Sequence, residues 1–250
     1  MRTTTPLIIG SEILSNECLG KDFYLMRAGL MKAAQGEPVR MGQFYMLRAW
    51  KNYPILSRPI CVFDEDGETV SFLYKIEGKG TEIFAALQKG DEIATRGPLG
   101  NSFPDVAGKI ALVGGGAGIA PFYLAARQLK ALHGSSRIDL YLGFSEEAVL
   151  TEEYKRVADN FIVNVGGFIT DEIDPACYDY IMACGPEPML RALYEKCRAA
   201  DAEERLFVSM ENRMACGVGA CLVCSCKTKD GNKRTCKDGP IFKGSEVFGI

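Results

Sequence analysis

The residues with the clearest chemical potential are four cysteines near the C-terminus, Cys216, Cys221, Cys224 and Cys236. The first three follow the spacing C-x4-C-x2-C in MACGVGACLVC, and the fourth comes after a lysine-rich stretch. This spacing is typical of the plant-type ligand set of a [2Fe–2S] cluster, and thiolates are soft, anionic ligands that bind iron well. The small residues between them let the loop fold tightly, with backbone N–H groups turned toward the sulfurs. The sequence therefore predicts a one-electron centre in a chain that transfers electrons.

Other uses of these cysteines fit the pattern less well. A zinc site more often shows two C-x2-C pairs, whereas the x4 loop with two glycines favours iron and sulfide. A disulfide framework needs an oxidising compartment and usually a small secreted chain. Cys226, two residues after Cys224, is the one rival ligand, but the C-x2-C spacing favours Cys224. We therefore expect that Cys226 does not ligate the cluster.

Composition limits the class of protein. With 250 residues, 47% of them hydrophobic, the chain can form two domains and a small appendage. A net charge of −3 argues against nucleic-acid binding by the chain as a whole. The N-terminus lacks the apolar core of a signal peptide, and glycines interrupt the longest apolar stretch, residues 110–126, so no membrane span is expected. Ten cysteines without a secretion signal indicate the reducing cytoplasm.

The two halves of the chain show different patterns. Up to about residue 100, short apolar or alternating runs such as residues 43–48 and 69–76 predict an antiparallel barrel or sandwich. One helix is expected over residues 82–87, with Thr81 as its N-cap, and the GPLGN segment at 97–101 predicts a domain edge.

From residue 109 onward, strands and helices alternate. Apolar runs predict strands at 110–113, 138–142, 161–163, 180–183 and 206–209, and helices are predicted at 121–131, 152–157 and 187–199. Because these strands look buried, the alternation predicts a doubly wound parallel sheet. We therefore expect a barrel in residues 1–101, an α/β nucleotide-binding domain in 102–209 and a small cysteine-bearing lobe in 210–250.

Glycine-rich turns follow two of the predicted parallel strands. GGGAGIAP at 114–121 opens a helix, and such a turn lets the backbone approach a pyrophosphate beside the N–H groups of the helix. CGPE at 184–187 is a second junction of this kind, and strand ends of one open sheet converge on one crevice. Either junction alone would also serve as a plain tight turn. The candidate nucleotide-binding residues are Gly114, Gly115, Gly118, Cys184 and Gly185.

Two motifs in the first half of the chain are candidate phosphate-binding sites. RPIC at 58–61 carries Arg58, whose guanidinium would bind a phosphate bidentately. GKGT at 78–81 places Gly80 and Thr81 at a helix start. Taken alone, the two motifs are better explained as a surface strand and a capped helix. Their position before the sheet domain favours the phosphate interpretation.

In combination, these motifs resemble the ferredoxin–NADP reductase superfamily in type and order. With the MACGVGACLVC segment and the tail at 236–242, nearly the whole chain resembles the electron-transfer subunits of type B dihydroorotate dehydrogenase. The resemblance implies FAD in the barrel, a nicotinamide nucleotide at the sheet and a [2Fe–2S] cluster facing a partner subunit. It implies these flavin contacts: Arg58 on the pyrophosphate; Pro59, Ile60 and Cys61 along the isoalloxazine; Leu73, Tyr74 and Lys75 along the flavin's tail; and Gly80 and Thr81 on phosphate.

The chain departs from this family's pattern in two places. Cys61 stands where the family usually has Ser or Thr, so a weak S–H donor replaces a hydroxyl. The stretch at 164–171 is shorter than the family's acidic, glycine-rich loop. In addition, Glu146 and Glu147 follow the strand at 138–142, where relatives that bind a 2′-phosphate tend to have Arg or Lys. These carboxylates favour NAD(H) over NADP(H).

The expected function is electron transfer between NAD(H), FAD and the cluster, to or from the FMN-containing catalytic subunit of dihydroorotate dehydrogenase in pyrimidine biosynthesis. The family resemblance implies a heterotetramer, and no residue of this chain need act as acid or base. The apolar lobe residues would be buried at that interface or in the lobe's own core: Val218, Leu222, Val223, Ile241 and Phe242. Two alternatives remain: the same module serving another partner, such as a sulfide dehydrogenase or hydrogenase, and a redox or zinc sensor without turnover.

Overall fold

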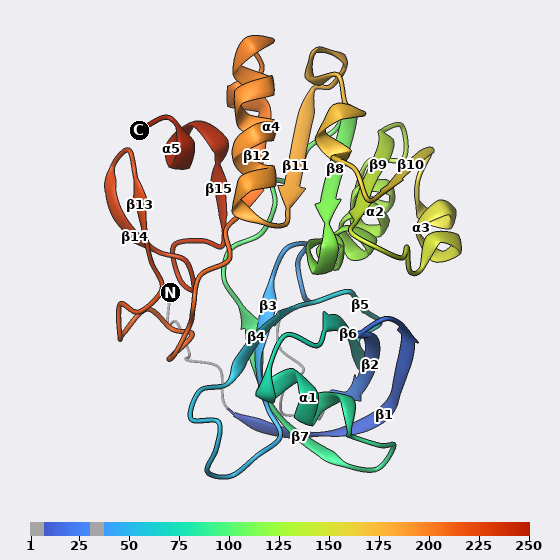
Figure 1. Cartoon of the computed structure of the whole chain (residues 1–250), viewed down its shortest axis with the longest axis vertical. Helices are drawn as coiled ribbons and strands as arrows, with labels where there is room; N and C mark the ends of the chain where they lie inside the picture. Colours follow the sequence, from blue (N-terminus) through green and yellow to red (C-terminus); the bar gives the residue numbers. More distant parts are fainter. Residues whose placement is uncertain (1–7, 31–37) are drawn as a thin grey trace.

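The computed structural model describes residues 8–30 and 38–250. Figure 1 shows a curled antiparallel sheet in blue and teal, a parallel sheet with its helices in green to orange above it, and a red lobe beside both. The N-terminal segment considered for a signal peptide lies outside the described residues. Two sheets therefore meet along one boundary, and the C-terminal lobe adjoins that boundary.

The first sheet is antiparallel, as predicted. Its strands, in the order β4-β3-β7-β1-β2-β6-β5, pair only with antiparallel neighbours. Buried residues such as Ile13, Leu47 and Phe72 form its core. The elements are β1 (Ile9–Gly20), β2 (Phe23–Gly29), β3 (Phe44–Arg48), β4 (Arg58–Cys61), β5 (Asp64–Glu65), β6 (Thr69–Lys75), α1 (Lys79–Ala85) and β7 (Glu92–Leu99).

Two local predictions in this half are corrected. Thr81 is not the N-cap of α1, because the helix begins at Lys79 and Gly78 takes the cap position. The Thr81 hydroxyl instead accepts hydrogen bonds from the backbone N–H groups of Glu77 and Gly78, at 2.9 and 3.2 Å. The break predicted at 97–101 starts only at Gly100, because β7 continues through Leu99.

The second sheet has the predicted doubly wound architecture. Its order is β10-β9-β8-β11-β12-β15, and all neighbours are parallel except β12 and β15. Every predicted strand and helix of this half is confirmed, with ends within two residues. The elements are β8 (Lys109–Gly115), the 3-10 turn η2 (Gly116–Ile119), α2 (Pro121–Leu132), β9 (Arg137–Phe144), α3 (Thr151–Val157), β10 (Asn160–Val165), β11 (Tyr180–Cys184), α4 (Glu187–Ala199) and β12 (Leu206–Ser209). The strand order reverses between β8 and β11, and ligands of open sheets bind at such switch points.

The C-terminal segment is tied to this sheet. It contains the hairpin β13 (Ser225–Thr228) and β14 (Gly231–Arg234), followed by β15 (Ile241–Lys243) and α5 (Gly244–Phe248). β15 pairs antiparallel with β12, and Ile241 and Phe242 are buried in the protein's own core. The lobe predicted for residues 210–250 therefore shares its last part with the parallel sheet, which leaves the cysteine loop and the hairpin projecting.

Candidate functional site

A cavity of about 740 Å³ opens between the two sheets. This volume lies in the range of cofactor sites. Among the residues predicted to contact a flavin, the cavity is lined by Arg58, Pro59, Ile60, Cys61, Leu73, Tyr74, Lys75 and Thr81. Gly80 stands behind this wall, where a Cβ would come within 2.5 Å of the Arg58 Nε. The structure thus brings two separate motifs, RPIC and GKGT, to one wall.

Arg58 is held in place by a backbone carbonyl and an aromatic ring. Its Nη1 donates to the Leu56 carbonyl at 2.5 Å, and its guanidinium lies over the Trp50 ring at 5.4 Å from the centroid. Within the described part of the chain, Arg58 forms no ion pair. An unpaired cation fixed in a cavity wall suits an anionic group such as a phosphate.

The two glycine-rich junctions meet at the switch point. A Cβ at Gly118 would overlap the carbonyl oxygen of Cys184 and lie 2.6 Å from the Gly185 Cα. A Cβ at Gly185 would lie 3.1 Å from the backbone nitrogen of Gly115. Only glycine permits this approach. The Cys184 side chain is fully buried, so this residue offers its backbone rather than its thiol to the site.

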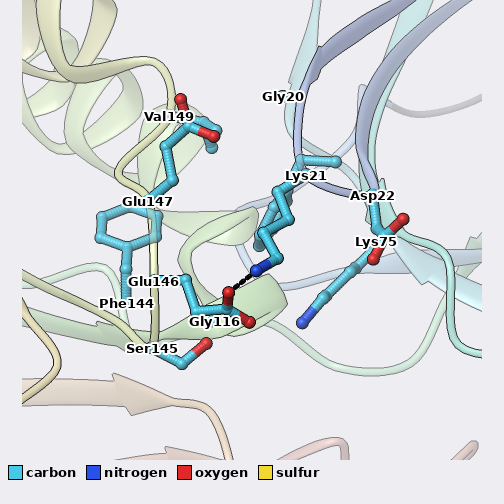
Figure 2. Close-up of a pocket in the computed structure, with 11 residues that line it drawn as sticks. Gly20, Lys21, Asp22, Lys75, Gly116, Phe144, Ser145, Glu146, Glu147 and Val149 are labelled. Atoms are coloured by element: carbon cyan, nitrogen blue, oxygen red, sulfur yellow. Dashed lines mark ion pairs between the residues drawn. The ribbon is translucent and has the colours of Figure 1, made fainter.

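Glu146 and Glu147 lie after β9, as predicted, at the edge that carries these junctions. They line a small cavity of about 40 Å³ together with Gly116 from η2 and with Lys21 and Lys75 from the barrel (Figure 2). The glycine-rich junctions and a group of charged side chains therefore lie along the same carboxyl edge of the parallel sheet.

Three of the predicted cluster cysteines, Cys216, Cys221 and Cys224, lie in the loop before β13, and the fourth, Cys236, follows β14. Backbone N–H groups of this loop donate to the sulfurs of Cys216 and Cys236. The Cys216 Sγ accepts from the N–H groups of Val218 and Ala220, at 3.5 and 3.3 Å. The Cys236 Sγ accepts from the Gly219 N–H at 3.1 Å. Burial alone would raise the pKa of the Cys216 thiol, but backbone donors outweigh it and lower this pKa to about 6. Such N–H groups stabilise thiolate sulfur, the form that binds iron.

The four thiols occur as two neighbouring pairs. Cys216 interacts with Cys221, and Cys236 interacts with Cys224, with a longer-range electrostatic effect between Cys216 and Cys236. Within residues 8–30 and 38–250, no three His, Cys, Asp or Glu side chains already converge as a closed metal site. The four thiols are nevertheless a donor set with the right chemistry for an iron–sulfur cluster.

Cys226 lies on the other side of the lobe. It packs with Phe242 and Val247 of the parallel-sheet core, whereas Cys224 and Cys236 pack with Met46 of the barrel. Burial raises the pKa of the Cys226 thiol, which favours its protonated form. This environment is that of a structural cysteine.

The cysteine loop shares residues with the large cavity. Phe44 and Met214 line the cavity and also pack with Cys224 and Cys236. The loop is fixed to the barrel because Arg96 donates to the Cys216 carbonyl at 3.2 Å. A group bound in the cavity and a group bound by these cysteines would therefore both lie against this shared cluster of side chains.

Comparison with known proteins agrees with this geometry. Residues 211–248 match the model of the iron–sulfur cluster binding domain of dihydroorotate dehydrogenase B. The chain is 45% identical over 219 residues to the electron transfer subunit of dihydroorotate dehydrogenase B (NAD(+)) of Clostridium acetobutylicum, covering 84% of this chain and 87% of that one. It is 33% identical over 251 residues to the corresponding subunit of Caldanaerobacter subterraneus, with 95% and 97% covered. The chain belongs to the electron transfer subunits of dihydroorotate dehydrogenase B.

A solved structure extends the similarity to the fold. The NADH-dependent reduced ferredoxin–NADP oxidoreductase superposes with a TM-score of 0.85 at 27% identity, over 99% of this chain and 91% of that chain. The ferredoxin reductase-like fold and the function predicted from the sequence are thereby confirmed. Family membership also confirms the expected cofactor classes, an iron–sulfur cluster and FAD with a nicotinamide nucleotide, and it rules out a sensor without turnover.

The structure adds to this electron transfer subunit several site residues that sequence reasoning missed. The last residue of β12, Ser209, and the segment after it, residues 210–214, line the large cavity. Its Glu211 carboxylate is accessible from the cavity yet enclosed by protein, and this desolvation raises its pKa. One available signal is the position of Glu211 just after a parallel strand, where ligands of open sheets gather.

No helix in residues 8–30 and 38–250 combines the length and apolar character needed to cross a bilayer.

Proposed function

We propose that the 740 Å³ cavity binds FAD, that the Gly114–Gly118 and Cys184–Gly185 junctions bind NAD(H), and that Cys216, Cys221, Cys224 and Cys236 ligate a [2Fe–2S] cluster. When bound, FAD supplies two-electron exchange with the nicotinamide, and the cluster supplies single-electron transfer. The chain's own residues bind and orient these groups. The observation that carries the proposal is that Phe44 and Met214 line the cavity and also belong to the buried cluster that contains Cys224 and Cys236.

The FAD assignment rests on the chemistry of the cavity wall. Arg58, which forms no ion pair with any residue that the structure describes, lies beside the start of α1, and Gly80 leaves the room that its guanidinium occupies. Ile60 and Leu73 supply apolar surface for a ring system. Burial raises the pKa of Cys61 to about 12, so its thiol stays protonated and serves as a weak donor.

Replacing Arg58 tests the FAD assignment. We expect Arg58→Ala to weaken FAD binding about 10- to 100-fold, because a charge-assisted hydrogen bond contributes ~1.5–3 kcal/mol. The matched control is Arg27→Ala, since Arg27 makes an exposed ion pair with Asp66 away from the cavity. Titration of the apoprotein with FAD measures the change. Heat denaturation that releases only FMN would contradict the assignment.

The nicotinamide nucleotide is proposed to be NAD(H) rather than NADP(H). Glu146 and Glu147 lie where the ribose next to the adenine would end, so their charges repel a 2′-phosphate. We expect kcat/KM for NADH with an artificial acceptor to exceed that for NADPH at least about tenfold, because like charges placed together cost several kcal/mol. Steady-state rates with both nucleotides measure the ratio. Equal or better use of NADPH would end this assignment.

The proposed partner is the FMN-containing catalytic subunit of dihydroorotate dehydrogenase, with two copies of each subunit, in the cytoplasm. Leu222 and Val223 support a partner at the cluster loop, because their side chains are 62% and 53% exposed between cysteines. Val218, by contrast, packs against the chain's own core. The 27% identical oxidoreductase favours a second candidate, in which the same module serves another partner. Copurification followed by a dihydroorotate assay distinguishes the two.

A further inference from the structure

The tip of the β1–β2 hairpin crosses from the barrel to the nucleotide-binding sheet. Lys21 forms an ion pair with Glu146, and its neighbour Gly20 lies so close to Glu147 that a Cβ there would be 2.9 Å from the carboxylate Oε2. Figure 2 shows the Lys21 side chain extended toward Glu146 across the gap, with the dashed line marking the pair. An ion pair thus connects the barrel to the parallel sheet next to the proposed NAD(H) site.

The gap beneath this pair is too small for a nucleotide. Its cavity of about 40 Å³ has room for only a few water molecules. Gly116, which belongs to the glycine-rich junction, forms part of its wall. A dinucleotide that runs from this junction toward the end of β9 must therefore separate Lys21 from Glu146.

The charged side chains in the gap determine which groups the adenine-side ribose of a bound dinucleotide would contact. Two cations, Lys21 and Lys75, and three carboxylates, Asp22, Glu146 and Glu147, line it. While Lys21 is paired with Glu146, that carboxylate is both neutralised and occupied. A ribose diol must compete with Lys21 for it, whereas a 2′-phosphate meets less negative charge than two free glutamates would present.

We propose that Lys21 is a specificity-determining residue for the nicotinamide dinucleotide, acting by competing with the ribose for Glu146. The inference rests on the proposed binding of NAD(H) at this edge. It predicts that Lys21 reduces the preference for NAD over NADP, and that Glu146 discriminates fully only when Lys21 is absent.

Calorimetric titration of the purified holoprotein with NAD⁺ and NADP⁺ tests this role. We expect Lys21→Met to raise the ratio of the NADP⁺ to the NAD⁺ dissociation constant about two- to fivefold, the range open to an exposed ion pair. Glu146→Gln should lower the ratio, because Lys21 then faces the 2′-phosphate unpaired. In the double variant, the effect of Lys21→Met should differ from its effect alone, since the two residues act on each other.

The matched control is Lys243→Met, which removes a cation from an exposed ion pair with Glu204 away from the gap. It should leave the ratio unchanged. An unchanged ratio in Lys21→Met, or equal weakening of both nucleotides, would overturn the proposal, since the second result describes a plain phosphate-binding cation. If wild-type protein binds neither nucleotide, the proposed NAD(H) site itself fails, so the two failures are distinguishable.

Discussion

Replacing Cys216, Cys221, Cys224 or Cys236 by serine is expected to remove nearly all iron and sulfide from the purified protein. In the proposed site each cysteine supplies one of the four thiolate ligands, and a serine hydroxyl is a much poorer ligand for iron. None of these four cysteines lines the cavity proposed for FAD, so FAD content and the bleaching of the flavin by NADH should persist. Iron and sulfide analysis, together with the visible spectrum, measures the loss.

Cys226 supplies the matched control. Because it is buried against Phe242 and Val247, Cys226→Ala should keep the cluster and lose only packing. Alanine is preferable to serine there, since an unpaired buried hydroxyl costs about 1–3 kcal/mol. Loss of the cluster in the Cys226 variant, with retention in the Cys224 variant, would reverse the ligand assignment.

Gly118→Ala is expected to reduce flavin bleaching by NADH at least about tenfold. The added methyl group would overlap the backbone of Cys184 and Gly185, which cannot move aside as a flexible side chain can. The two junctions must then separate, which distorts the proposed seat of NAD(H) and destabilises the fold by roughly 1–3 kcal/mol. Stopped-flow reduction measures the rate, and thermal unfolding measures the stability.

Gly134→Ala is the matched control for this substitution. Gly134 follows the end of α2, and a Cβ there would meet no atom within 4 Å. It should change neither the rate nor the melting temperature appreciably. If Gly118→Ala folded normally and reduced its flavin as fast as Gly134→Ala, the junctions would not form the nucleotide site.

The parallel sheet could be predicted from the sequence because its strands are apolar runs bounded by turn residues. Such runs are buried on both faces, so local pattern and tertiary environment agree. β15 could not be predicted in this way, because it is three residues long and exists only through pairing with β12. The prediction that Thr81 is an N-cap was wrong because a threonine occurs both at the cap and, as in α1, at the third helical position.

The candidate site shows the same division. Motifs such as RPIC and GGGAGIAP carry their chemistry in consecutive residues and could be identified. Lys21 could not, and Glu211 offered only its position after a parallel strand, because the surroundings of both residues depend on how distant segments meet. Glu211 matters only because the barrel encloses it, and Lys21 only because the β1–β2 turn reaches β9.

The central claim is that this chain transfers electrons between NAD(H) and a catalytic partner. It is tested most directly by measuring electron transfer first in the isolated chain and then in its complex with that partner. We expect NADH to bleach the flavin of the chain alone, while dihydroorotate alone leaves that flavin unchanged. Addition of the catalytic partner should then couple dihydroorotate oxidation to NAD⁺ reduction. Turnover of dihydroorotate by this chain without a second polypeptide would contradict the account, and so would failure of NADH to bleach its flavin.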